Sequence, residues 1–302
     1  MPQLRREIMG KDSAIEWTDH TFNAWWGCTK ISAGCANCYA QDLAERFGYN
    51  GCFGKGQPRK HMSDKYWAEP LKWDRAAAKA GKRARVFCAS MGDVFDLEAP
   101  MRERARLWKL IEATPNLQWL ALTKRIESLW VLSPMTWLSG SWPENVAVGV
   151  TVENQAVVKR VAALVEMKKR YGIPMVFVSV EPMLGPVWLE SLPDWVICGG
   201  ESGINARPMN PNWARGLRDQ CNAAGVPFLF KQWGEWGALE DHPETMSNIP
   251  ICFYDESIVG TIPGWQNGLS SGGQQHMVRI GKKKAGRLLD GKEWNQYPED
   301  RG

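Results

Sequence analysis

The sequence predicts an α/β fold, a closed or partial (βα) barrel of about six to eight parallel strands. Seven short apolar runs rich in Val, Phe, Trp and Leu follow one another, and each ends in a polar or glycine-containing cluster. Segments with helical spacing lie between several of these runs. Continuous apolar strands that alternate with helices are typical of a parallel sheet covered on both faces. An open, doubly wound sheet is the alternative, since a single sequence does not reveal strand order.

The expected strands share this apolar composition and a polar end. In chain order they are TFNAWWGC (21–28), ARVFCASMGDVFD (84–96), LQWLALTKR (117–125), NVAVGVTVEN (145–154), PMVFVSVEP (174–182), DWVICGGESG (194–203) and VPFLFKQWG (226–234). In a (βα) barrel the chemistry gathers at the carboxyl ends of the strands. All seven polar clusters fall there, which makes the barrel mouth the expected site.

Four segments carry an apolar stripe at helical spacing. Residues 37–51 have Tyr39, Leu43 and Phe47 on one stripe, and residues 100–115 have Ala105, Trp108, Leu110 and Ile111 near one face. The other two expected helices span 154–172 and 210–225, and both stop at a glycine. An Asn-Pro pair at the start of 210–225 suits a helix cap and first turn.

The last part of the chain has a different composition. From Gly234 onward it is rich in Gly, Ser, Asn and Pro, with weak strand signals only in PICFYD (250–255) and HMVRIG (276–281). We therefore expect residues 1–233 to form the barrel domain. Residues 234–302 are expected to form an irregular extension packed on the barrel mouth.

Composition limits the class of protein. Of the 302 residues 44% are hydrophobic and 23% are charged, as in a globular protein, and the net charge of +4 permits a polyanionic partner. Neither a secretory signal nor an apolar run long enough to span a bilayer is visible, so we expect a cytoplasmic protein with no membrane partner. The 17 tryptophans either fill the core or offer flat surfaces on which bases or sugars stack.

The stretch GCTKISAGCANCYA (27–40) concentrates three thiols, Cys28, Cys35 and Cys38. In a reducing compartment these are better read as metal ligands than as disulfide partners. A structural zinc site needs four ligands, and His20 or His61 would supply the fourth. A four-iron cluster held by three thiolates instead leaves one iron open for a small molecule.

The position of the three cysteines favours a cluster over zinc. They lie between the first expected strand and the first expected helix, at the functional end of a barrel. Cys88, Cys198 and Cys221 sit within apolar segments and are interpreted as small buried residues. The sequence assigns no role to Cys52.

A cysteine triplet after the first strand of a (βα) barrel resembles the radical S-adenosylmethionine enzymes. The resemblance implies that the three thiolates hold a [4Fe–4S] cluster whose open iron binds S-adenosylmethionine for radical chemistry. Six and two residues separate the cysteines here, which is wider than the usual spacing of that superfamily. Asn37 precedes the third cysteine where an aromatic residue is usual, and Tyr39 follows it.

A closer resemblance covers nearly the whole chain. The motifs that carry it are WTDHTFNAWWGCTKISAGCANCYA (17–40), TKR (123–125), GVTVEN (149–154), SVEPMLGP (179–186), GGESG (199–203), FKQWG (230–234) and AGRLLDG (285–291). In this order they look like an uncharacterised, phage-associated three-cysteine family that is grouped by analogy with radical S-adenosylmethionine proteins. This resemblance implies the cofactors but not the reaction.

The remaining candidate residues lie at strand ends or in the basic C-terminal segment. The candidate catalytic residues are Glu181, Glu201 and Lys231. The candidate cofactor-binding residues are Ser90, Gly92, Asp93, Thr151, Glu153, Asn154, Gly199 and Gly200. The candidate substrate-binding residues are Lys124, Arg125, Gln232, Lys282, Lys283, Lys284 and Arg287.

Each of these roles has a structural alternative. The glutamates at strand ends either hold an amine and act as acids or bases, or they pair with the nearby cations. Cationic groups around a pocket suit a carboxylate, a phosphate or a nucleotide. The lysine run is a phosphate-binding surface or simply a solvated face.

Two functions fit these observations. One is a radical S-adenosylmethionine enzyme that modifies a nucleic acid base, a nucleotide or a related small molecule, with DNA, RNA or a nucleotide as its substrate. Such an enzyme needs an electron donor such as flavodoxin or ferredoxin. The alternative is a nucleic-acid-binding protein with a structural zinc or iron–sulfur site. The number of ionisable groups at strand ends favours the enzyme.

Overall fold

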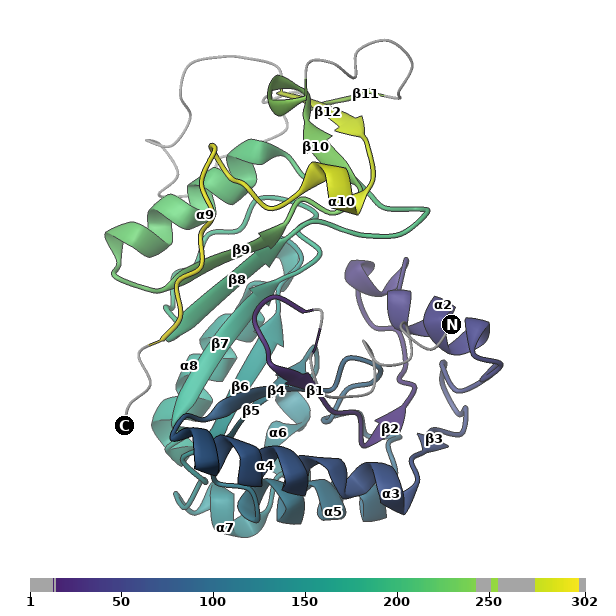
Figure 1. The fold of residues 1–302 in the computed structure, drawn as a ribbon. Coiled ribbons are helices and arrows are strands. Elements are labelled where there is room, and N and C mark those ends of the chain that lie inside the picture. The colour runs from purple at the N-terminus through teal and green to yellow at the C-terminus, as the bar shows by residue number, and fades with distance from the viewer. Residues whose placement is uncertain (1–12, 14, 243–250, 255–274, 299–302) are drawn as a thin grey trace. The chain divides into compact units, whose positions relative to one another are not determined.

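The computed structural model describes residues 13, 15–242, 251–254 and 275–298 (Figure 1). By compactness the chain divides into two units. Unit 1 comprises residues 1–150 and 163–176, and unit 2 comprises residues 151–162 and 177–302. The expected division into residues 1–233 and 234–302 stays a prediction.

The main sheet confirms the α/β class. Its seven parallel strands follow chain order, with β1 and β9 at the two edges: β1 (His20–Thr21), β4 (Ala84–Cys88), β5 (Leu117–Thr123), β6 (Val146–Thr151), β7 (Met175–Val180), β8 (Trp195–Gly199) and β9 (Phe228–Gln232). A doubly wound sheet reverses its strand order at a switch point, and this order does not reverse. The partial barrel is therefore the form observed, and the closed barrel and the doubly wound sheet are not.

The first strand is shorter than the sequence predicts. After β1 the backbone N–H of Asn23 donates to the Tyr66 hydroxyl at 2.9 Å, and its side-chain Oδ1 accepts from the Met91 N–H at 2.7 Å. Because Asn23 makes these contacts, the chain leaves the main sheet. Trp25–Trp26 form β2 instead, which pairs antiparallel with β3 (Lys60–His61) in a separate two-stranded sheet.

The four expected helices are present within the described residues, as α2 (Tyr39–Arg46), α5 (Met101–Glu112), α8 (Lys159–Tyr171) and α9 (Pro211–Ala223). The structure also contains helices that the sequence analysis did not predict: α3 (Asp64–Trp67), α4 (Glu69–Ala80), α6 (Leu129–Leu132) and α7 (Met135–Leu138). In α9 the Asn210 side chain accepts from the Asn212 N–H and Pro211 starts the first turn, as the sequence predicts.

One face of α5 differs from the prediction. Ala105 is exposed, and Arg104 is buried at 3% exposure together with Leu107. The Arg104 guanidinium donates to the carbonyls of Val94, Asp96 and Ala99. A buried cation is tolerated here because these carbonyl oxygens satisfy its N–H groups.

Most of the tryptophans lie in the core. In unit 1 Trp17, Trp25, Trp26, Trp119 and Trp137 are at most 1% exposed. Among the tryptophans that the structure describes, Trp130 alone is exposed, at 58%. The interpretation that the tryptophans fill the core is therefore confirmed. Burial of such large side chains supplies much of the hydrophobic stabilisation.

The C-terminal part of unit 2 contains more regular structure than the sequence predicts. β10 (Trp236–Ala238), β12 (Gln275–Arg279) and β11 (Ile251–Tyr254) form an antiparallel sheet in that order, followed by α10 (Lys282–Ala285). The chain then runs along the edge strand β9, where Phe230 N–H donates to Trp294 O and Gln296 N–H donates to Phe228 O. This pairing protects an edge that would otherwise offer unpaired backbone groups.

No helix among the described residues combines the length and the apolar composition that crossing a membrane requires.

Candidate functional site

The cysteine loop (residues 27–38) starts where three backbone segments meet. Gly27 N–H donates to Met91 O at 2.8 Å, and Gly27 pairs with Gly92 in a parallel bridge. Gly27 has a φ of +105°, and a Cβ built on it would lie 1.9 Å from the carbonyl oxygen of Cys52. Only glycine allows this approach, so Gly27 fixes the point from which Cys28 leaves the sheet.

The three thiols come from different local structures of this loop. Cys28 follows Gly27 directly, and its carbonyl accepts from Gly54 N–H at 3.0 Å. Cys35 ends the short 3-10 helix η1 (Ala33–Cys35), and Cys38 is the N-cap residue of α2.

The thiols share one electrostatic environment. Burial raises the pKa of Cys28 to about 12, and the negative charges of Asp93, Cys38 and Cys35 add to this effect while Arg125 opposes it. The pKa of Cys35 lies below its ordinary value. Burial would raise it, but the charge of Lys124 and hydrogen bonds from Ile31 and Ser32 outweigh that effect. Deprotonation of one thiol therefore disfavours deprotonation of Cys28, and a bound cation would relieve that repulsion.

Thiolates are ligands that both zinc sites and iron–sulfur clusters accept, so the residue type fits a cluster. In the described part of the chain there is no group of three or more Cys, His, Asp or Glu side chains that could hold a metal ion. His20 stacks on Trp73 at 4.5 Å between ring centroids, and His61 pairs with Glu103 at 3.2 Å. The two histidines considered as a fourth zinc ligand thus have other contacts.

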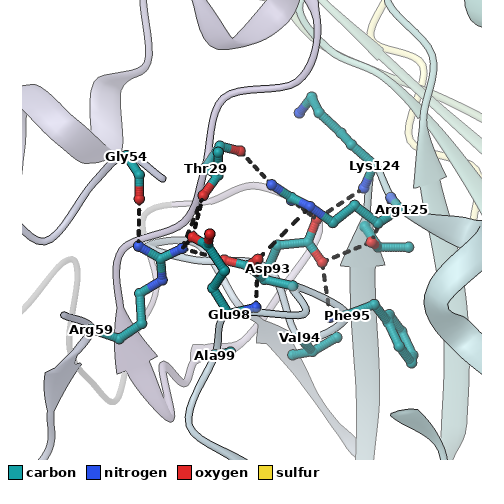
Figure 2. Close-up of polar contacts among 12 residues, drawn as sticks. Thr29, Gly54, Arg59, Asp93, Val94, Phe95, Glu98, Ala99, Lys124 and Arg125 are labelled. Atoms are coloured by element: carbon teal, nitrogen blue, oxygen red, sulfur yellow. Dashed lines mark hydrogen bonds and ion pairs between the residues drawn. The ribbon is translucent and has the colours of Figure 1, made fainter. Parts of the chain in front are cut away.

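Asp93 is brought next to the cysteine loop and is fully engaged (Figure 2). It is 5% exposed, and its carboxylate accepts from the Thr123 hydroxyl, the N–H groups of Lys124 and Phe95, and the Arg125 guanidinium at 2.8 Å. The Lys124 side chain extends away from this carboxylate (Figure 2). Of the predicted site residues in unit 1, Asp93, Lys124 and Arg125 therefore lie close to the thiols.

Ser90 and Gly92 connect the end of β4 to the same region. The Ser90 hydroxyl bonds with the Asn23 side chain, and its carbonyl accepts from the Tyr39 hydroxyl at 2.9 Å. Gly92 forms the bridge with Gly27, and a Cβ there would lie 3.2 Å from the Trp25 indole nitrogen. Both residues thus support the loop backbone, and their predicted cofactor contacts stay predictions.

Sequence reasoning missed Arg59. Its side chain is 1% exposed and donates to Asp96 at 2.8 Å, to Glu98 at 2.9 Å and to the Thr29 hydroxyl at 3.0 Å (Figure 2). It also donates to carbonyls of Cys52, Gly54 and Gln57. Arg59 lies in a glycine-rich segment without apolar periodicity, so no sequence signal distinguishes it from a surface arginine.

In unit 2 each predicted acidic residue is paired with a cation. Glu181 accepts from Lys231 Nζ at 2.6 Å. Glu153 pairs with Arg160 at 3.0 Å, and Glu201 binds Arg207 through both carboxylate oxygens, at 2.5 and 2.8 Å. Lys231 therefore forms an ion pair with a glutamate, which is the structural alternative that the sequence analysis set beside ligand binding. Arg160 and Arg207 were not singled out by the sequence, since each follows its partner by six or seven residues within ordinary polar segments.

The glycines at the ends of β8 and β9 permit a close approach of two loops. A Cβ on Gly200 would lie 1.9 Å from Trp233 O, and one on Gly234 would lie 2.1 Å from Glu201 O. A Cβ on Gly199 would lie 3.2 Å from Glu181 Oε2. The GGESG and FKQWG motifs therefore pack backbone to backbone.

The other predicted residues of unit 2 lie as follows. Thr151 is buried and its carbonyl accepts from Arg160 at 2.8 Å, and the Asn154 side chain caps the 3-10 helix η3 (Gln155–Val157). Gln232 donates to the Ser202 hydroxyl at 3.1 Å, while its buried Oε1 has no hydrogen-bond partner among the described residues.

The basic C-terminal residues lie on the surface of unit 2. Lys282, Lys283 and Lys284 are exposed on α10. Arg287 donates to the Asn295 side chain. Unit 1 thus contains the thiols with Asp93, Lys124 and Arg125, and unit 2 contains three acid–cation pairs.

Comparison with known proteins gives similarity at two levels. A doubly substituted spore photoproduct lyase with bound AdoMet and dinucleoside spore photoproduct matches with 14% identity and a TM-score of 0.45, over 91% of this chain and 72% of that chain. A second variant of that lyase with dinucleoside spore photoproduct matches with 13% identity and a TM-score of 0.44, over the same shares. No curated protein matches the sequence.

At the level of sequence families, residues 12–298 match the family described as protein of unknown function (DUF5131). The match includes the cysteine loop, all seven strands of the main sheet and the basic C-terminal segment. The chain is therefore a member of the DUF5131 family.

Proposed function

We propose that this protein is a radical S-adenosylmethionine enzyme that modifies a nucleic acid base, a nucleotide or a related small molecule. The observation that carries the proposal is the cysteine loop itself, which places Cys28 directly after the bridge between Gly27 and Gly92, Cys35 at the end of η1 and Cys38 at the N-cap of α2. In this proposal Cys28, Cys35 and Cys38 hold a [4Fe–4S] cluster. When bound, the cluster and S-adenosylmethionine supply the radical chemistry.

The acid–cation pairs of unit 2 differ in how exposed their side chains are to solvent. The side chains of Glu153 and Glu201 are only 1% and 4% exposed and are bound by arginines. The Glu181 and Lys231 side chains are 13% and 17% exposed. We assign the ligand-binding role in unit 2 to this pair, because Glu181 is the most exposed of the three carboxylates, with Glu181 accepting an amine and Lys231 meeting an anionic group.

In unit 1 we assign substrate contact to Lys124 rather than to Arg125. Arg125 is 7% exposed and donates to Asp93 and to the Thr29 carbonyl. Lys124 is half-buried, and its charge already lowers the pKa of Cys35. A phosphate-bearing substrate would gain a charge-assisted hydrogen bond from Lys124. The reaction draws its electron from a small redox protein of the flavodoxin or ferredoxin type.

The test is the metal content of protein purified without oxygen. We expect brown protein that takes up about four irons per chain, with a paramagnetic signal in the reduced state that changes on addition of S-adenosylmethionine. Stoichiometric zinc with no uptake of iron contradicts the proposal and favours a nucleic-acid-binding protein with a structural metal.

Cysteine variants identify the ligands. Replacing Cys28, Cys35 or Cys38 with Ala should each abolish iron uptake, because the remaining two thiolates bind too few irons. Cys88→Ala is the matched control, since Cys88 is 1% exposed within β4 and should affect stability through packing alone. Iron uptake that survives Cys35→Ala but not Cys88→Ala refutes the assignment of the loop.

A further inference from the structure

We propose that Thr29 is a positioning residue that fixes Cys28 before metal binds, with Arg59, Arg125 and Glu98 as the groups that hold it. This inference rests on the proposed function for its consequence in the loaded protein. Its geometric part concerns the metal-free chain alone. Thr29 follows Cys28 directly, so any restraint on its backbone restrains the thiol as well.

Every polar group that Thr29 offers beyond its N–H is engaged by an ionised side chain (Figure 2). Its hydroxyl donates to Glu98 Oε2 at 2.9 Å and accepts from Arg59 Nη2 at 3.0 Å. Its carbonyl accepts from Arg125 Nη2. Hydrogen bonds to ionised groups are the stronger ones, so Thr29 is held on two sides.

The groups that hold Thr29 are themselves fixed. The Arg59 and Arg125 side chains are 1% and 9% exposed. Arg59 pairs with Asp96 at 2.8 Å, Arg125 pairs with Asp93 at 2.8 Å, and Asp96 also lies 4.0 Å from Arg125. We call the contacts of Arg59, Arg125 and Glu98 with Thr29 the clamp. Its two arginines belong to a buried network that joins the loop before β3, the loop after β4 and the end of β5.

The clamp acts on one end of the cysteine loop. Gly54 N–H holds the Cys28 carbonyl, and the two arginines hold Thr29, whereas Ile31 in the middle of the loop is 45% exposed. Cys35 and Cys38 are fixed instead by η1 and α2. Cys28 lacks a helix of its own, so the clamp supplies the order that a preformed metal site requires.

Thr29→Val tests the clamp because it keeps the shape of the side chain and removes both hydroxyl contacts. In the metal-free protein we expect iodoacetamide to alkylate Cys28 about 10-fold faster, as measured by peptide mass spectrometry. Thr29→Ser retains the hydroxyl and should restore the rate to within about twofold of the wild type. Thr136→Val, on the exposed face of α7, is the matched control and should leave the rate unchanged.

Glu98→Gln gives an independent variant, since the Glu98 side chain is 34% exposed and its replacement spares the buried core of the network. It should accelerate alkylation of Cys28 in the same direction, while Glu127→Gln, at an exposed position without a role in the clamp, should not. After loading with ferrous iron and sulfide, Thr29→Val should lose iron to a ferrous chelator about 10- to 100-fold faster than the wild type.

The outcomes separate the clamp from the cluster. Unchanged alkylation of Cys28 in both Thr29→Val and Glu98→Gln overturns the positioning role. Faster alkylation in these variants, together with a wild-type protein that takes up no iron, supports the clamp and refutes the proposed function. Faster alkylation at Cys38 as well as Cys28 would mean general loosening of the loop, which also overturns a role specific to Cys28.

Discussion

At the residue scale, Asp96 determines whether a buried arginine is tolerated. Its side chain is 4% exposed and accepts from Arg59 at 2.8 Å and from the Glu98 N–H at 3.2 Å. Asp96→Leu leaves the Arg59 charge partly uncompensated, so we expect a loss of about 3–5 kcal/mol in the free energy of unfolding. Urea denaturation of metal-free protein measures this loss.

The control for Asp96 is Glu98→Gln. The Glu98–Arg59 pair is partly exposed and water screens it, so Glu98→Gln should lower the free energy of unfolding far less than Asp96→Leu does. Equal effects of the two substitutions would mean that burial does not govern the strength of this network.

Comparison of Gly27 with Gly48 separates two reasons why a position needs glycine, a close backbone contact and a positive φ. Gly27→Ala meets the Cys52 carbonyl at 1.9 Å in addition to the cost of a positive φ, and should prevent the loop from closing. Gly48→Ala also has a positive φ, +77°, but meets nothing within 4 Å, so it should cost only about 1 kcal/mol. Thermal unfolding of both variants checks the difference, and similar melting temperatures would argue against the close approach at Gly27.

At the scale of elements, Asp290 ties the C-terminal segment to α9. It accepts from Arg215 at 2.7 Å and also from Arg218, both on α9. Burial acts to raise the pKa of Asp290, but hydrogen bonds and charges from Arg218 and Arg215 outweigh it and hold the pKa below its ordinary value. The folded state thus binds this proton more weakly than the unfolded state.

The sign of the resulting pH dependence follows from linkage. The stabilisation by Asp290 is fully present above the unfolded pKa and is lost as the pH falls through the folded pKa, which is the lower of the two. Asp290→Asn should therefore lower stability at neutral pH and make the curve of stability against pH flatter in acid. Denaturation at pH 6 and pH 3 tests this, and a variant as acid-sensitive as the wild type would contradict it.

At the scale of the whole molecule, a net charge of +4 gives only a weak general attraction to a polyanion. The exposed Lys282, Lys283 and Lys284 concentrate charge on α10. Replacing all three with Gln should weaken nucleic-acid binding mostly at low salt and lower the slope of log K against log salt by about 2–3. A binding series from low to high salt measures this slope.

The control replaces three exposed lysines of unit 1, Lys79, Lys82 and Lys109, with Gln. Replacing these lysines removes the same total charge, but they are not consecutive like Lys282, Lys283 and Lys284. The slope of log K against log salt should therefore change less. Wild-type protein that binds neither DNA nor RNA at low salt would exclude a polynucleotide and leave a small anionic substrate.

The sequence by itself determined where the six strands from β4 to β9 (β5, β6, β7 and β8 between them) and the helices α2, α5, α8 and α9 lie along the chain, and the loop that carries the three thiols. Apolar runs such as MVFVSV (175–180) and polar ends such as Glu181 report burial locally, and burial on both faces of a strand is specific to a covered parallel sheet. The Asn-Pro start of α9 was likewise readable, because a helix cap depends on neighbouring residues only.

Only the tertiary structure decided how the charges pair. Arg59 and Asp96 are 37 residues apart and Lys231 and Glu181 are 50 residues apart, so no local pattern joins either pair. Helical spacing within α5 likewise did not reveal that Arg104 is buried in place of Ala105. Arg104 is buried because carbonyls of another segment accept its hydrogen bonds. The cysteine loop could be found from its composition, but the clamp on Thr29 arises from segments that only folding brings together, because electrostatic partners are chosen by distance in space.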